Sequence, residues 1–216
     1  MIGPRAVLLA ASVAMLSQAV LAQAPAEVAS SVRVGDHWTY DRKNEITGAY
    51  KDTYTETVTE VSPQEVVTSA ALQGKSESTV TAYDPDWNVI TNGVWKYKPT
   101  AGVGLRPPLA VGKEWRSEYI QSHIVTNARL KVLSISKITG QETITVPAGT
   151  YAAFKVERQT RATNVAAPAV VAEYQSVMWY APEINHWVRR MTLAKLNKRT
   201  VSNVSEELTA FARKEP

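Results

Sequence analysis

The sequence predicts an all-β protein: a single curved antiparallel sheet, or half-barrel, built from two consecutive meander-like halves with little helix. Apolar and polar residues alternate along most of the chain, and turn residues interrupt the alternation about every 8–12 residues, as in antiparallel sheets. The motif V-G-x-x-W at 34–38 recurs at 111–115, and each copy precedes a run of alternating residues. The same offset pairs Val58 with Ile135. No long amphipathic helix pattern is present.

Residues 1–22 have the pattern of a secretory signal peptide. One positive charge near the start is followed by an apolar run over 6–20 and by small residues at a cleavage site. The apolar run is shorter than the ~20 residues that a membrane-spanning helix needs. We therefore expect a processed chain that does not span a membrane, with a retained anchor as the alternative. A disordered tether is expected over 23–31 and a single β-rich domain over 32–213.

The chain contains no Cys, so neither disulfide bonds nor a lipid-bearing Cys at the cleavage site is available. An exported protein without disulfides must be held together by its core, and this suits a bacterial periplasm. The formal net charge is +4 and the pI about 9.2, with basic clusters only at 189–190 and 195–199. This mild excess predicts no nucleic-acid partner and leaves attraction to anionic envelope surfaces open.

The first half begins with an alternating stretch that places Trp38 and Tyr40 on one face. We expect strands over 32–42, 50–61, 62–74, 77–83, 87–90 and 94–98. The segment 62–65 also has features of a helix start, namely an N-cap Ser, a Pro at the first helical position and a Glu at the capping-box position. The β-branched run that follows and the register of the repeat favour a strand. Asn92-Gly93 between two apolar runs predicts a tight hairpin.

The two halves are joined by a Gly- and Pro-rich loop over 100–109, either a connection over the rim or a flap. In the second half, strands are expected over 115–125, 128–138, 142–146, 150–159, 174–180 and 186–193. Turns are expected at Thr139-Gly140, at 147–149 and at 181–185. Residues 165–172 have the composition of an edge or loop. The last segment, 201–213, fits either a short helix or a closing strand.

The three histidines, His37, His123 and His186, form no motif that binds a metal or activates a nucleophile. Neither H-E-x-x-H nor G-x-S-x-G occurs in the sequence. Asp84-Pro85-Asp86 supplies two carboxylates, too few ligands for a Ca²⁺ site, and is expected to be a turn. The sequence therefore predicts a non-enzymatic protein with no metal and no cofactor.

Five of the six tryptophans, all except Trp179, are assigned either to the core or to the candidate ligand-binding residues. Trp38 and Trp115 belong to the repeated motif and are expected in the core, where each indole N–H needs an acceptor. The candidate ligand-binding residues lie near the predicted hairpin or on the strand that begins at 186: Trp87, Trp95, Tyr97, Trp187 and Arg189. An apolar pocket with a few polar groups is typical of a site for a hydrophobic ligand.

Four segments resemble an exported bacterial family of unknown function: V-P-A-G-T-Y-A-A-F-K-V at 146–156, M-W-Y-A-P at 178–182, W-V-R-R at 187–190 and P-L-A-V-G-K-E-W at 108–115. The family motifs are V-P-A-G-T-[FY]-x-A-[FY]-K-V, W-[YF]-x-P and V-K-R. Its members are similar to periplasmic carriers and outer-membrane receptors of lipoproteins. The resemblance implies a half-barrel with an apolar concave side and a final strand over 207–211. Such carriers place helices as a lid over that side, and here only 62–74 could supply one.

Two hypotheses about function follow, with a third held as a minor alternative. The first is a non-catalytic periplasmic protein that binds a lipid or a lipidated protein on its curved sheet by burying apolar surface. The second is an adaptor of the cell envelope, with a solid core, that binds another envelope protein through a sheet edge or the Pro107-Pro108 loop. The third is a hydrolase. A cavity inside the sheet would favour the first hypothesis over the second.

Overall fold

The computed structural model describes residues 32–100 and 104–214, and in these residues twelve antiparallel strands form one closed barrel. The strands are β1 (His37–Asn44), β2 (Tyr50–Val61), β3 (Val66–Leu72), β4 (Ser78–Tyr83), β5 (Val89–Asn92), β6 (Trp95–Lys98), β7 (Glu114–His123), β8 (Arg129–Val146), β9 (Gly149–Asn164), β10 (Val171–Ala181), β11 (His186–Leu196) and β12 (Arg199–Ala212). A 3-10 turn, η1 (Pro182–Ile184), lies between β10 and β11. The all-β class expected from the sequence is confirmed.

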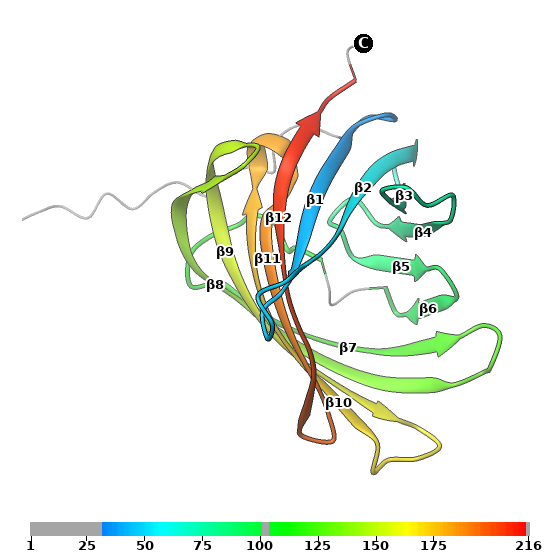
Figure 1. The fold of residues 1–216 in the computed structure, drawn as a ribbon. Coiled ribbons are helices and arrows are strands. Elements are labelled where there is room, and N and C mark those ends of the chain that lie inside the picture. The colour runs from blue at the N-terminus through cyan, green and yellow to red at the C-terminus, as the bar shows by residue number, and fades with distance from the viewer. Residues whose placement is uncertain (1–31, 101–103, 215–216) are drawn as a thin grey trace, which may run out of the picture.

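The barrel is closed because its last strand pairs with its first. Trp38 of β1 is opposite Phe211 of β12, and Asn44 is opposite Val204. Each remaining strand pairs with the next one along the chain (Figure 1). The predicted open half-barrel is therefore wrong, although the meander order is correct. The segment that fitted either a helix or a strand is a strand, and its pairing leaves no free edge at β1 or β12.

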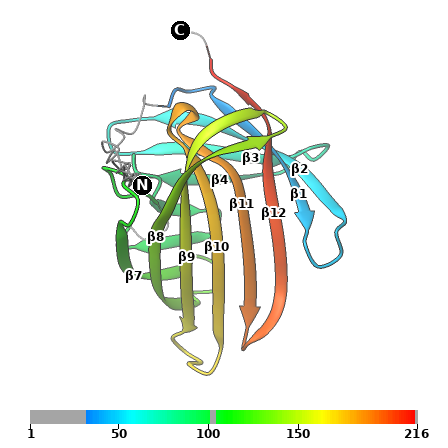
Figure 2. The ribbon, with the colours of Figure 1, turned by 90° about the vertical axis from the view of Figure 1, so that its left-hand side faces the viewer.

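The two sides of the barrel differ in strand length. The strand β8 has 18 residues and β9 has 16, whereas β5 and β6 have four each. Figures 1 and 2 show the long strands β8 to β12 on one side and the short strands β3 to β6 on the other. The long strands therefore form a tall wall on one side of the barrel interior, and the short strands form a low wall on the other.

The repeated motif forms the same turn twice. Gly35 has φ of 95° and Gly112 has φ of 90°, and their N–H groups donate to the carbonyls of Val58 and Ile138, each at 2.8 Å. Val58 is thus the structural counterpart of Ile138, and its pairing with Ile135 by constant offset is wrong. The physical reason is that the second hairpin is longer: β7 has 10 residues and β1 has 8.

We expect Gly112→Ala to lower the free energy of unfolding by about 1–2 kcal/mol, because an L side chain at a positive φ is strained. A Cβ at Gly112 would meet no atom within 4 Å, so the cost comes from the backbone alone. Gly140→Ala is the matched control, since a Cβ there also meets nothing within 4 Å and no positive φ is required. Urea denaturation of both variants measures the difference. Equal stability of the two would contradict the proposed role of Gly112.

Two local predictions also need correction, and a third is confirmed over most of its length. Thr139-Gly140 is not a turn, because β8 continues through it and absorbs an irregularity between Ile138 and Gly140. Trp87 is not in a strand, since it has φ of 62° and β5 begins only at Val89. The loop expected over 165–172 is confirmed for 165–170, which connect β9 to β10, and β10 begins at Val171.

Two other local predictions are confirmed. The segment after Ser62 enters a strand, β3, rather than a helix. Ser62 Oγ accepts the N–H of Glu65 at 3.0 Å, so the helix-start signature makes a turn that leads into the strand. The Asn92-Gly93 hairpin connects β5 to β6, with Asn92 opposite Trp95. No helical lid forms over 62–74.

The signal peptide (1–22) and the tether (23–31) predicted from the sequence lie outside the described residues. In the range 32–100 and 104–214, no helix has the length and apolar character that a transmembrane span requires.

Candidate functional site

The barrel encloses a cavity of about 660 Å³. Along β10, the residues that line it become less exposed from one end to the other: Tyr174 is 39% exposed, Met178 9% and Tyr180 3%. The mouth of the cavity therefore lies at the end of the barrel where the β9–β10 hairpin turns, and its floor lies toward Tyr180. Figure 2 shows this hairpin at the lower end of the long wall.

Buried aromatic rings form the floor. Trp38 is fully buried, stacks on His186 with ring centroids 4.2 Å apart and meets Trp87 edge-on at 5.9 Å. The Trp38 indole donates to the carbonyl of Ile184 at 3.3 Å. Trp87 and Trp187 belong to the same ring cluster and also line the cavity. The floor is thus the end of the main hydrophobic core.

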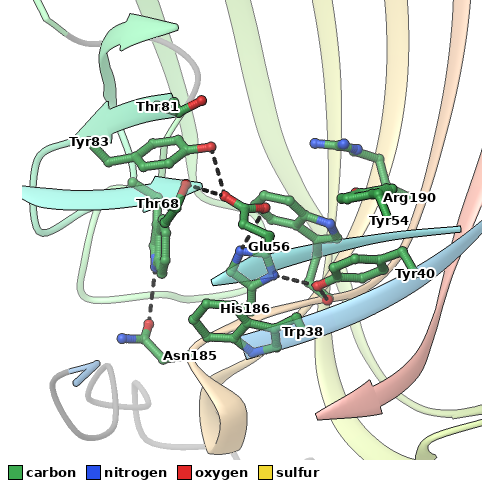
Figure 3. A network of polar contacts seen from close by, with 12 residues as sticks. Trp38, Tyr40, Tyr54, Glu56, Thr68, Thr81, Tyr83, Asn185, His186 and Arg190 are labelled. Carbon is green, nitrogen blue, oxygen red and sulfur yellow. Dashed lines mark hydrogen bonds and ion pairs between the residues drawn. The ribbon is translucent and has the colours of Figure 1, made fainter. Parts of the chain in front are cut away.

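A buried carboxyl group, Glu56, lies beside this cluster (Figure 3). It accepts hydrogen bonds from Thr68 Oγ1 at 2.8 Å and from the Tyr83 hydroxyl at 3.3 Å. Its second oxygen lies 3.8 Å from His186 Nε2. Burial raises the pKa of Glu56, against the opposing effect of Thr68 and Arg190, because a carboxylate is poorly solvated there.

His186 is held in its neutral form by the same burial. Its pKa is lowered well below the ordinary value, first by burial and then by Arg190. The Tyr40 hydroxyl donates to the carbonyl of Trp187 at 2.8 Å, so its oxygen accepts from His186 Nδ1 at 2.5 Å. The proton is therefore on Nδ1, and the lone pair of Nε2 faces the carboxyl group of Glu56.

The order Tyr40, His186, Glu56 has the residue types of a catalytic relay, but these groups are inside the core. Tyr40 and His186 are 0% exposed and Glu56 is 4% exposed. The network therefore connects β1, β2 and β11 under the floor. Among the described residues, no group of three or more His, Cys, Asp and Glu side chains could hold a metal ion.

A row of alternating charges crosses four strands above the floor. Arg190 of β11 is opposite Glu206 of β12, which is opposite Arg42 of β1, which is opposite Asp52 of β2. Arg190 forms an ion pair with Glu206, and Arg42 forms one with Asp52. Burial disfavours the Arg190 cation, yet Glu206 and Tyr54 together hold its pKa above the ordinary value. We call these four residues the ionic row.

A second polar region lies on β8 to β11. Arg158 of β9 is opposite Ser136 of β8 and Ser176 of β10, and Ser176 is opposite Thr192 of β11. Arg158 is 8% exposed and lines the cavity. It donates to Ser136 Oγ at 2.8 Å and to the carbonyl of Gly104 at 3.2 Å. Burial lowers the pKa of Arg158 to about 10, with Tyr119 acting in the opposite direction.

Three of the five candidate ligand-binding residues, Trp87, Tyr97 and Trp187, line the cavity. Trp95 instead packs edge-on against His123, with centroids 4.8 Å apart. Arg189 pairs with Glu207 at 2.5 Å. Of the two adjacent arginines, the one that lines the cavity is Arg190.

A local irregularity explains why Arg190, and not the predicted Arg189, lines the cavity. Trp187 is opposite Tyr180 and Arg189 is opposite Trp179, so Val188 is an extra residue in β11. Such a bulge changes which residues of a strand point to each face. Simple alternation from Trp187 therefore selects Arg189, whereas the bulge turns Arg190 inward.

Sequence reasoning also missed Arg158. Val156, Arg158 and Thr160 share one face of β9 by the period of two, and all three line the cavity. An arginine on the same face as a buried valine was the available signal. The alternation along 150–159 places Arg158 on this face, but the sequence alone does not show that the face lines a cavity.

The fold and the cavity define the chain as a closed, antiparallel, twelve-stranded barrel with a hollow interior. A predicted lipoprotein from Parabacteroides distasonis aligns with a TM-score of 0.52 at 14% identity, over 83% of this chain and 96% of that one. A predicted exported protein with a YmcC-like fold from Bacteroides fragilis aligns with a TM-score of 0.53 at 16% identity, over 84% and 97%. At these identities the likeness concerns the fold alone.

The hypothetical lipoprotein YmcC from Escherichia coli is a more distant match, with a TM-score of 0.48 at 9% identity, over 85% of this chain and 92% of that chain. No protein-family model matches the sequence, and no curated protein does either. The chain therefore shares its architecture with bacterial proteins whose names give no activity.

Proposed function

We propose that this chain is a non-catalytic protein of the bacterial periplasm that holds a lipid-like molecule inside its barrel. The molecule is either a free lipid or the acyl chain of a lipidated protein, because both offer the same apolar chemistry. The cavity carries the proposal: its volume of about 660 Å³ is in the range of about 300–1,000 Å³ that is usual for small-molecule sites.

The wall of the cavity supports a ligand that is mainly apolar. Trp87 and Leu105 line it near the floor, and Val156, Met178 and Val132 line it on the long wall. Removing a ligand chain from water against these side chains contributes about 25 cal/mol per Å² of apolar surface. The interior of a closed barrel thus takes the place of the concave sheet expected from the sequence.

An exported location is supported by the signal-peptide pattern and by the two structural neighbours, which are described as a lipoprotein and an exported protein. The adaptor hypothesis requires a packed interior, and the cavity counts against it. The hydrolase hypothesis requires a nucleophile or general base open to substrate, and the His186 network is buried. Ligand binding is the function that the geometry favours.

Native mass spectrometry of the protein purified from the periplasm tests this proposal. We expect a population heavier than the polypeptide by the mass of one lipid, which an organic extract then releases. A protein-sized addition would indicate a lipidated partner instead. The contrary result is a single unliganded mass together with no saturable binding of a neutral, apolar fluorescent dye.

A blocking variant makes this test specific to the cavity. Ala194 of β11 lines the cavity, so Ala194→Trp is expected to reduce dye binding at least tenfold by filling the space. Ala152 of β9 is exposed, and Ala152→Trp serves as the matched control that leaves binding unchanged. Equal binding by both variants would place the dye elsewhere and contradict the proposed site.

A further inference from the structure

Three neighbouring hairpins, β7–β8, β9–β10 and β11–β12, form one continuous edge at the mouth of the cavity. They are linked by backbone hydrogen bonds: the N–H of Val165 donates to the carbonyl of Arg129 at 2.9 Å. The N–H of Asn197 donates to the carbonyl of Val171 at 2.8 Å. Figure 1 shows the three hairpins next to one another at the far ends of β7 to β12. We call the following residues the rim: 124–129, 165–170 and 195–199.

The side chains at the tips of the rim are apolar and exposed. Val125, in the β7–β8 hairpin, is 70% exposed. The β9–β10 hairpin has the sequence V-A-A-P-A-V over 165–170, and all six of these residues are exposed. At the opposite end of the described barrel, the exposed large apolar side chains are those of Val34, Val61 and Val111. An apolar patch gathered around the entrance of a cavity marks an interaction surface.

The backbone of these tips has few N–H groups left to offer to water or to a protein. Asn164 Oδ1 accepts the N–H groups of Ala166 and Ala167, at 2.9 Å and 3.1 Å, and Pro168 has no N–H. In the β7–β8 hairpin, His123 Nδ1 accepts two successive backbone N–H groups, at 3.3 Å and 3.1 Å. Unpaired peptide groups are costly to place in hydrocarbon, so tips whose N–H groups are already paired are suited to enter it.

The charged residues of the rim are all cationic, and the rim contains neither Asp nor Glu. Its four basic residues are Arg129, Lys195, Lys198 and Arg199. Among the described residues, none of the four forms an ion pair. Glu173, which is opposite Lys195 in the sheet, is paired with Arg161. A second copy of the rim would bring like charges together, so charge complementarity favours an anionic surface as the partner.

We infer that the rim docks the barrel, mouth first, on the surface of a membrane that contains anionic lipid. The apolar tips enter the boundary between head groups and acyl chains, and the basic residues beside them contact lipid phosphates. Apolar side chains combined with Lys and Arg are typical of segments that lie in a membrane interface. This inference goes beyond the proposed function, because it names a partner and rests on the rim rather than on the cavity.

Co-sedimentation with lipid vesicles tests the inference. One set of vesicles contains phosphatidylcholine alone, and the other also contains phosphatidylglycerol as about one third of its lipid. We expect the protein to bind the anionic vesicles at least tenfold more tightly, because each basic residue near an anionic surface contributes roughly fivefold in affinity. Binding should weaken as the salt concentration rises, since salt screens exposed charges. Equal binding to both vesicles would overturn the inference, and binding to neither would overturn it in favour of a protein partner.

The variant Lys198→Gln with Arg199→Gln removes two charges from the rim. It is expected to weaken binding to the anionic vesicles about tenfold or more. Arg33→Gln with Lys137→Gln is the matched control, since it removes the same charge from exposed positions away from the rim. The control should change binding by less than about threefold, because charges far from the membrane surface are screened. Equal losses in the two variants would contradict docking through the rim.

The apolar tips are tested separately by Val125→Ser with Val170→Ser, which leaves every charge in place. Because apolar surface no longer enters the membrane, we expect binding to weaken about tenfold. Val34→Ser with Val111→Ser is the matched control, since these exposed valines lie at the opposite end of the barrel and should not affect binding. Circular dichroism establishes that each variant is folded. Unchanged binding after the loss of Val125 and Val170 would mean that the tips do not enter the membrane.

The apolar fluorescent dye separates docking from binding inside the barrel. The cavity-filling variant Ala194→Trp should lose dye binding and still sediment with anionic vesicles, whereas Val125→Ser with Val170→Ser should keep dye binding and sediment less. Rim variants that sediment like the unchanged protein would overturn the docking inference, and dye binding would leave the proposed function intact. Salt-dependent sedimentation of a protein that binds no dye would contradict the proposed function and leave docking in place.

Discussion

Replacing Trp38 with alanine is expected to lower the free energy of unfolding by about 4 kcal/mol, the cost of removing a large buried aromatic side chain. Trp38 is 0% exposed, stacks on His186 and donates its indole N–H to the carbonyl of Ile184. The change therefore leaves both a cavity and an unpaired carbonyl oxygen under the floor of the site. Chemical denaturation monitored by circular dichroism measures the loss.

The second copy of the motif supplies the control. Trp115 is 5% exposed, and among the described residues its indole nitrogen has no hydrogen-bond partner. Trp115→Phe is expected to change stability by less than about 1 kcal/mol, because removal of a buried, unsatisfied N–H offsets part of the cost of the lost volume. Trp38→Phe should cost about 2 kcal/mol, since the same loss of volume is joined by the loss of the hydrogen bond to Ile184. Equal costs at the two positions would contradict this distinction.

Removing the carboxyl group of Glu56 is expected to cost about 3 kcal/mol in the variant Glu56→Ala, because the buried hydroxyls of Thr68 and Tyr83 lose their acceptor. Glu56→Gln keeps an oxygen in the same place and should stay within about 1 kcal/mol of the unchanged protein near neutral pH. Urea denaturation of the two variants compares these costs. A Glu56→Gln protein as unstable as Glu56→Ala would show that the oxygen acceptor is not what matters.

A comparison of Glu56→Gln with the unchanged protein also separates two pH effects on stability. Since burial raises the pKa of Glu56, its contribution to stability is present below its ordinary value of 4.5 and is lost as pH rises through the raised pKa. The lowered pKa of His186 acts in the opposite direction: its contribution is present above 6.5 and is lost as pH falls below that value. In the folded protein Glu56 therefore keeps its proton to a higher pH, and His186 loses its proton at a lower pH, than the same groups do in the unfolded chain.

Unfolding free energies measured from pH 4.5 to pH 8 should therefore diverge. Glu56→Gln has no carboxyl group to ionise, so it is expected to gain stability relative to the unchanged protein as pH rises above 4.5. The loss of stability as pH falls below 6.5, which comes from His186, should remain in both proteins. Identical pH profiles would mean that Glu56 does not titrate abnormally.

Strands were the part of this fold that the amino-acid pattern predicted best. The expected strand over 50–61 coincides with β2, and the hairpin at Asn92-Gly93 connects β5 to β6 as expected. Alternation succeeds here because each strand has one face in the interior and one in solvent, so burial follows the period of two. It fails at irregularities such as the one at Gly140, where the pairing shifts but the strand continues.

The candidate site was predictable only in part, because irregularities in the strands and the identity of neighbouring strands are not visible in the alternation of residues. Trp87, Tyr97 and Trp187 are large aromatic residues near predicted hairpins or strand ends, and all three line the cavity. Arg158 and Arg190 were missed because a charged residue on an apolar face has no meaning until the neighbouring strands are known. The bulge at Val188 then decided which of two adjacent arginines faces inward.

The sequence by itself determined the all-β class, the order of most strands and the V-G-x-x-W turns, because these depend on local conformation and on alternation within a strand. Closure of the barrel was decided only by the tertiary structure, since it depends on β1 pairing with β12 across the length of the chain. The ionic row depends on that closure, because it crosses from β12 to β1. The hydroxyl groups around Arg158 depend instead on the register of β8 to β11. Register is set by bulges and hairpin lengths, which alternation alone does not reveal.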